Sequence, residues 1–181
     1  WHPERMVTAF NGLSAKAQEL WLWWNLPLPD KRLITFTDII DEEPVGVKWD
    51  SPEKTKLLLS MMTEANLSKV KAAMKSGQRI VGGLYKRTRK DDNGVKAQRA
   101  EVRFDGIAGC LRTPAGGSSR QSILVVEGEQ VRSRLLSPRE AARLMGLPDT
   151  YKLPDNYNDA YHIAGDGVVV PVVSHLSRFI F

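Results

Sequence analysis

The chain has 181 residues, of which 42% are hydrophobic and 26% charged, a balance typical of a globular protein with one domain or one and a fraction. No apolar run approaches the ~18–20 residues that span a bilayer, and no secretory signal opens the chain, so we expect a cytoplasmic protein. The single cysteine, Cys110, and three scattered histidines exclude an internal disulfide and a Cys/His cluster, so we expect no metal.

The first predicted element is a strand over residues 1–10, which ends at Asn11-Gly12. Such a strand would need a sheet that this chain does not contain. The tryptophan-rich stretch 21–24 follows and is expected to be core and wrapping rather than a stacking site. A further strand is predicted over residues 32–40.

Two helices and three strands are predicted in the middle of the chain. Ser51 followed by Pro52 is typical of a helix start, and the leucines and methionines behind it favour a buried face. A second helix carries apolar residues at helical spacing over 67–74 and ends at Gly77. The strands are expected over residues 79–84, 96–104 and 122–126.

Basic side chains concentrate in the same region. Residues 79–143 carry 14 basic and 7 acidic side chains, a net charge of +7 that leaves −2 on the remainder. A basic face of this kind most often binds a polyanion, nucleic acid above all, and a solvated charged surface is the alternative. The run Lys86–Lys90 precedes Asn93-Gly94, a strong turn signal, so we expect a hairpin with phosphate contacts along its rim.

Residues 111–121 read Leu-Arg-Thr-Pro-Ala-Gly-Gly-Ser-Ser-Arg-Gln. The paired glycines let the backbone approach a partner closely and present its N–H groups. Arg112 and Arg120 carry planar donors that suit phosphate oxygens and the guanine edge. We expect this loop to contact a partner; a solvated turn between two strands is the alternative.

The carboxyl-terminal part predicts helices. Ser137 caps a helix whose Glu140 reaches back to the cap, and Gly146 ends that helix. The helices and joint expected after it are a short helix over 157–163, a flexible joint over 165–167, and a last helix over 168–181. The last helix is apolar almost all round near its start, so it needs a partner surface.

These motifs resemble the carboxyl-terminal part of the cytosine-5 DNA methyltransferases. Residues 136–151, Leu-Ser-Pro-Arg-Glu-Ala-Ala-Arg-Leu-Met-Gly-Leu-Pro-Asp-Thr-Tyr, resemble the ninth conserved block, with a leucine in place of the usual aromatic residue. Residues 161–173 resemble the tenth block, in which Asp166 stands for the usual asparagine. Residues 105–117 resemble the paired recognition loops, and residues 2–7 the end of the eighth block.

The resemblance implies an α+β fold. A small mixed target-recognition domain, with helices and short antiparallel strands, would be followed by C-terminal helices that in the full enzyme pack on a Rossmann-like α/β catalytic domain. Residues 1–10 would be the last strand of the catalytic domain, 11–135 the target-recognition domain, and 136–181 the helices of the methyltransferase core.

The resemblance also implies methyl transfer from S-adenosyl-L-methionine to carbon 5 of a cytosine flipped out of the duplex. The family's cofactor turn, Pro-Cys block and Glu-Asn-Val block do not occur in this sequence. Cys110 follows Gly109 and is expected to be a small buried thiol rather than a nucleophile. We therefore expect the DNA-reading part of an enzyme, inactive alone, with the cofactor bound mainly by residues that the sequence lacks.

Site residues follow from these motifs. Arg5 would hydrogen-bond the flipped cytosine, with an ordinary strand arginine as the alternative. Arg112 and Arg120 would read guanine, whereas Thr113 and the glycine pair would hold phosphate. Residues expected to contact the cofactor are Asp166, Gly167 and Val168. Residues expected to contact DNA are Arg103, Asp105, Arg112, Thr113, Gly116, Gly117, Ser118, Ser119, Arg120 and Gln121.

The expected partners are double-stranded DNA, the catalytic part of the same enzyme, and a second copy of this chain through its exposed last helix. The expected setting is bacterial or phage cytoplasm. Two other interpretations stay open. A non-enzymatic DNA-binding module or the small subunit of a split methyltransferase would share these motifs, and a protein-interaction domain would leave the basic face merely solvated.

Overall fold

The computed structural model describes residues 2–24, 26–31, 33–90, 94–111, 113 and 120–180. Within them the chain forms two compact units, Trp1–Lys31 with His175–Phe181, and Arg32–Ser174. The second unit holds the sheet together with the helices that cover it, an α+β arrangement as predicted. The proposed packing on a separate catalytic domain and the domain boundaries at 10 and 135 stay predictions.

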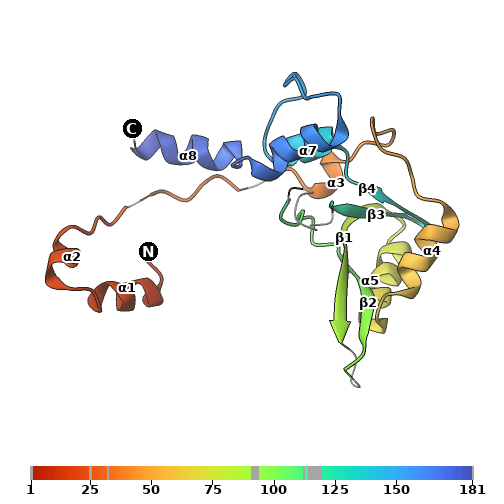
Figure 1. Cartoon of the computed structure of the whole chain (residues 1–181), viewed down its shortest axis with the longest axis horizontal. Helices are drawn as coiled ribbons and strands as arrows, with labels where there is room; N and C mark the ends of the chain where they lie inside the picture. The colour runs from red at the N-terminus through yellow and green to blue at the C-terminus, as the bar shows by residue number, and fades with distance from the viewer. Residues whose placement is uncertain are drawn as a thin grey trace. The chain divides into compact units, whose positions relative to one another are not determined.

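The sheet has four antiparallel strands in the order β2-β1-β3-β4 (Figure 1). The strands are β1 (Arg79–Lys90), β2 (Lys96–Arg103), β3 (Ser122–Glu127) and β4 (Gln130–Leu135). Lys90 pairs with Lys96 across the predicted β1–β2 hairpin, which is confirmed. The strand β4 was not predicted; it pairs with β3 through a tight turn at Gly128, whose φ is +55°.

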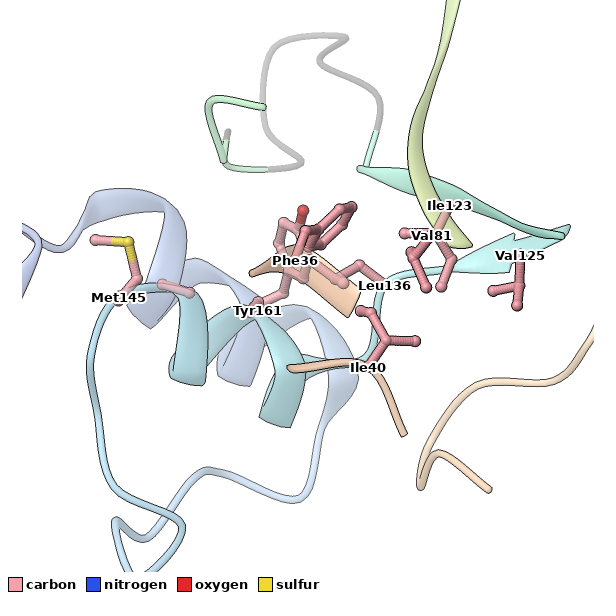
Figure 2. Close-up of a cluster of buried hydrophobic side chains, with 10 residues drawn as sticks. Phe36, Ile40, Val81, Ile123, Val125, Leu136, Met145 and Tyr161 are labelled. Carbon is pink, nitrogen blue, oxygen red and sulfur yellow. The ribbon is translucent and has the colours of Figure 1, made fainter. Parts of the chain in front are cut away.

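Each face of the sheet is covered by helices. The side chains of β3 alternate between the two faces and therefore enter two separate cores. Ile123 and Val125 belong to a core with the helices α3 (Phe36–Ile39), α6 (Pro138–Leu144) and α7 (Tyr157–Asp166). Figure 2 shows side chains of this core, which come from helices and strands. Leu124 and Val126 belong to a second core with α4 (Pro52–Ser60) and α5 (Glu64–Lys75). A strand buried on both faces explains the unbroken apolar run at this point.

The helices of the second unit are α3 (Phe36–Ile39), α4 (Pro52–Ser60), α5 (Glu64–Lys75), α6 (Pro138–Leu144), α7 (Tyr157–Asp166) and the start of α8 (Val170–Ile180). The predicted caps are confirmed: the Ser51 and Ser137 hydroxyls accept from the N–H groups of Lys54 and Glu140. Gly77 and Gly146 follow helix ends with φ of +66° and +81°, a conformation that favours glycine.

Two predicted strands are helices instead. Residues 4–11 form α1 (Glu4–Asn11), preceded by Pro3 and with an acidic first turn, features that favour a helix over the short alternation seen in the sequence. The segment 32–40 contains the single-turn helix α3, because Asp38 Oδ2 accepts from both Thr35 N and Thr35 Oγ1 at 2.7 Å.

The first unit also contains α2 (Ala15–Glu19) and a group of aromatic rings. Trp23 lies 5.2 Å from Phe10 and 5.5 Å from Trp21 between ring centroids. These rings contact one another but are not core as predicted, since Trp21 and Trp23 remain 38% and 37% exposed. Neither α1 nor α2 buries a residue.

The end of the chain differs in detail from the prediction. The helix α7 continues through Gly165 and Asp166, so the break falls at Gly167 rather than over a three-residue joint. The stretch Tyr157–Ile180 is apolar and long enough to cross a membrane by length and composition alone, which the sequence reading did not anticipate. One such stretch is weak evidence for a membrane span, and this one is interrupted at Gly167 between α7 and α8.

Candidate nucleic-acid interface

A cavity of about 610 Å³ opens where the β1–β2 hairpin, α5 and the start of β3 meet. Among the described residues, its charged lining consists of five cations and one carboxylate: Lys69, Lys86, Arg87, Arg103, Arg120 and Glu101. We call this surface the basic cavity. A hollow lined mainly by one sign of charge concentrates the field and attracts anions.

Several cations of the basic cavity make contacts within the protein, but these contacts do not neutralise the positive charge of the group. Arg87 Nε lies 3.5 Å from Glu101 Oε2, an exposed pair of little energetic weight. Lys69 Nζ donates to the Val102 carbonyl at 3.4 Å and to Asn66 Oδ1 at 3.3 Å. Lys86 and Arg87 are exposed. The cavity therefore keeps a positive excess.

Arg103 and Asp105, two of the predicted site residues, form an ion pair at the end of β2. Arg103 Nε donates to Asp105 Oδ2 at 3.1 Å, and Asp105 Oδ1 accepts from the Ile107 N–H at 3.3 Å. The hydrogen bond from Arg103 lowers the pKa of Asp105. Both side chains are about half exposed, so the arginine is oriented and still open to a ligand.

The segment entering the predicted loop lies against Tyr85 of β1. A Cβ added at Gly109 would lie 2.8 Å from Tyr85 Cζ, so a larger residue requires the ring or the loop to shift. Burial raises the pKa of the Tyr85 phenol. Neither Tyr85 nor Lys69 was predicted as a site residue. The contact between Tyr85 and Gly109, 24 positions later, cannot be recognised from a single sequence.

The segment leaving the loop is fastened to α7. The Arg120 guanidinium lies 5.0 Å from the centroid of the Tyr157 ring and donates to Asn158. The Gln121 N–H donates to Tyr161 Oη at 3.1 Å. Gln121 is only 6% exposed. Its side-chain amide donates to the Leu84 and Ser122 carbonyls, at 3.2 and 2.7 Å, and serves the fold.

Several predicted residues lie outside the described part of the chain, namely Arg112, Gly116, Gly117, Ser118 and Ser119. Thr113 is described and partly buried. Cys110 contradicts its prediction as a buried thiol, because it is exposed and lines the basic cavity. Its neighbours Gly109 and Leu111 leave the thiol at the surface of a loop.

The remaining predicted residues are not among those that line the basic cavity. Arg5 is exposed on α1 rather than on a strand. Asp166, Gly167 and Val168 form an exposed turn, in which the Gly167 N–H donates to the Ile163 carbonyl at 3.1 Å. Within the described ranges, no three His, Cys, Asp or Glu side chains gather as a metal site.

Comparison with known proteins adds an independent finding. The model of a family described as C-5 cytosine-specific DNA methylase matches residues 26–181. The type II methyltransferase M.HpaII of Haemophilus parainfluenzae is 29% identical over 165 residues, which cover 83% of this chain and 39% of that protein.

Two further relatives match shorter stretches. The type II methyltransferase M.HhaI of Haemophilus parahaemolyticus is 37% identical over 73 residues, 40% of this chain and 21% of that protein. The type II methyltransferase M.NlaX of Neisseria lactamica is 35% identical over 57 residues, 32% of this chain and 18% of that protein. The chain thus spans well under half the length of each of these relatives.

Proposed function

Because the chain belongs to the C-5 cytosine-specific DNA methylase family, we propose that it is the sequence-specific DNA-recognition portion of a DNA (cytosine-5-)-methyltransferase. In the whole enzyme a methyl group would pass from S-adenosyl-L-methionine to carbon 5 of a cytosine extruded from the duplex. This chain would bind the duplex and determine where that reaction occurs, in the cytoplasm where the DNA lies.

One observation carries the proposal. Both ends of the loop 111–120 border the basic cavity, since Gly109 and Cys110 line it on one side and Arg120 and Gln121 on the other. The cavity thus joins cations suited to phosphate with the segment suited to base edges. Phosphate contacts would fix the position of the duplex, and the loop would supply the sequence preference.

Catalysis is assigned to residues outside this chain. The only cysteine, Cys110, follows a glycine and is exposed in a loop. The predicted cofactor contacts, Asp166, Gly167 and Val168, stay a proposal, and their open turn leads us to place the cofactor mainly on other residues. Arg5 keeps its proposed contact with the flipped cytosine. We expect no methyl transfer by this chain alone.

Titration of a fluorescent duplex with the 181-residue chain tests DNA binding. We expect log K to fall linearly with log salt between about 50 and 200 mM, with a slope of roughly 0.9 per phosphate contacted. Lys86→Ala, in the basic cavity, should weaken binding, whereas Lys56→Ala removes the same charge from α4, outside the cavity lining. Absence of binding at low salt would refute the proposal.

The alternatives predict different results. A protein-interaction domain would not bind DNA; the exposed apolar side chains of α8, among them Val172 and Val173, are the observation in its favour. Mixing the chain with one that bears the missing blocks separates a methyltransferase part from a non-enzymatic DNA-binding module. Methyl incorporation only in the mixture supports the former. Sedimentation of the chain alone tests the proposed pairing of two copies through α8.

A further inference from the structure

One edge of the Arg120 guanidinium is already occupied by the protein. Its Nη2 donates to Asn158, and its Nε is buried with no hydrogen-bond partner among the described atoms. The edge formed by these two nitrogens therefore faces α7. Bidentate reading of guanine needs two neighbouring donors free on one edge of the guanidinium, so this edge is not available to a base.

The surface that receives Arg120 is rigid. The rings of Tyr157 and Tyr161 stack with centroids 5.8 Å apart and planes 12° apart. Tyr157 Oη donates to the Leu136 carbonyl at 2.8 Å, so the ring under the guanidinium is fixed at its far end. Tyr161 is fully buried. A cation over such a ring gains attraction from its π face.

The next residue of the chain is held by the same helix. Tyr161 Oη accepts from the Gln121 N–H at 3.1 Å. Two consecutive residues at the end of the loop are thus held by the first turns of α7, through Tyr157, Asn158 and Tyr161. This helix begins with Asn156 as its cap and buries Ala160 and Ala164. No comparable set of contacts is needed merely to end a solvated turn.

We propose that α7 positions the end of the DNA-reading loop. Asn158 holds Arg120 in place, and Arg120 does not itself contact a base. This inference rests on the proposed function, DNA recognition by this chain. It adds positioning residues, Asn158, Tyr157 and Tyr161, which would set sequence preference without touching DNA. Arg120 and Gln121, held by α7, present this end of the basic cavity in one geometry, and we expect preference at several base pairs to depend on that geometry.

Selection from a randomised duplex library, followed by sequencing, measures base preference at every position for the 181-residue chain and its variants. Asn158→Ala and Arg120→Ala should each lower the preference at several positions by about fivefold or more, and the double variant should do no worse than either single one. Asn158→Asp keeps an acceptor for Arg120 and suits the first turn of a helix, so it should retain the wild-type profile.

The opposite result is equally specific. If Arg120→Ala removes preference at one base pair only and Asn158→Ala changes none, Arg120 reads a base directly and the inference is wrong. Thermal unfolding of each variant checks that it is folded.

Hydrogen exchange provides a readout without DNA. Tyr161→Phe removes the acceptor of the Gln121 N–H, so that amide should exchange at least about tenfold faster while the amides of β3 keep their protection. An unchanged rate at Gln121 contradicts the inference. Failure of the wild-type chain to bind DNA contradicts the proposed function instead, and the exchange result then decides whether α7 holds the loop.

Discussion

Two arginine–carboxylate pairs in this molecule have the same chemistry and opposite surroundings. The side chains of Arg134 and Glu140 are both 0% exposed, whereas those of Arg103 and Asp105 are 52% and 43% exposed. Only the second pair borders the basic cavity. Burial, rather than residue type, separates an arginine that holds the fold from one that is available to DNA.

Among the described residues, every polar side-chain atom of the buried pair except one has a hydrogen-bond partner. Arg134 donates to Glu140 through Nη1 at 2.8 Å and Nη2 at 2.6 Å. The same carboxylate accepts from the N–H groups of Asp41 and Ser137, both at 2.8 Å. Arg134 Nε is buried without a partner. The pair therefore ties β4, the α6 cap and the segment after α3 into one structure.

Breaking the buried pair should give the largest effect. Arg134→Met leaves the Glu140 carboxylate buried without its partner, which typically costs about 3–5 kcal/mol of unfolding free energy. Chemical denaturation measures this loss. Arg103→Met is the matched control and should leave the unfolding midpoint nearly unchanged. Equal losses in the two variants would show that burial does not separate the pairs.

Lowering the pH should provide a second test of the difference between the buried and the exposed pair. Burial alone would raise the pKa of Glu140, but hydrogen bonds from Arg134 and the Ser137 N–H outweigh it and hold the pKa below its ordinary value. This contribution to stability is present above the unfolded-state pKa of about 4.3 and is lost as the pH falls through the lower folded-state pKa. Glu140→Gln should therefore flatten the acid limb of stability in denaturation at several pH values. An unchanged acid limb would assign the loss to other carboxylates.

A change at Gly109 should affect binding and not stability. Gly109→Ala places a methyl group against the Tyr85 ring and displaces the entrance to the loop. We expect DNA affinity to fall about tenfold, the equivalent of roughly 1.4 kcal/mol, with thermal unfolding preserved. Gly109→Ala combined with Tyr85→Ala removes the collision and should recover part of the affinity. Full affinity in the single variant would show that the close approach of Gly109 to Tyr85 does not position the loop.

Arg103→Met should have the smallest effect. If Arg103 contacts one phosphate, the slope of log K against log salt should decrease by about 0.9, and base preference should stay the same. Fluorescence titration over a salt series measures the slope. Loss of preference at a single base pair would instead make Arg103 a base reader.

Elements with local chemical signals were predictable from the sequence. Ser137 and Glu140 form the predicted capping box, and Gly146 ends that helix, because each signal acts within a few residues. The β1–β2 hairpin followed from Asn93-Gly94 in the same way. The strand β4 was not predictable, since Arg134 interrupts its apolar pattern and is buried only because Glu140 pairs with it.

The residues of the candidate site also divide into those that local sequence signals indicate and those that depend on distant contacts. Arg103 lines the basic cavity, and the basic character of this part of the chain is visible in the sequence as net charge; its contact with DNA stays a prediction. The orientation of Arg120 depends on Asn158, 38 positions away, and the exposure of Cys110 depends on the path of a loop; neither is encoded by a local pattern. Distant contacts, rather than composition, decide which predicted residues face a ligand.

The contacts of Asp41 also impose an order on folding. Its N–H donates to Glu140, 99 positions later, and its carbonyl accepts from Arg134, 93 positions later. A ribosome adds about 5–20 residues per second, so the segment after α3 waits on the order of 5–20 s for its partners to be synthesised. Until then the segment after α3 lacks the hydrogen bonds from Arg134 and to Glu140 that hold it in the folded chain.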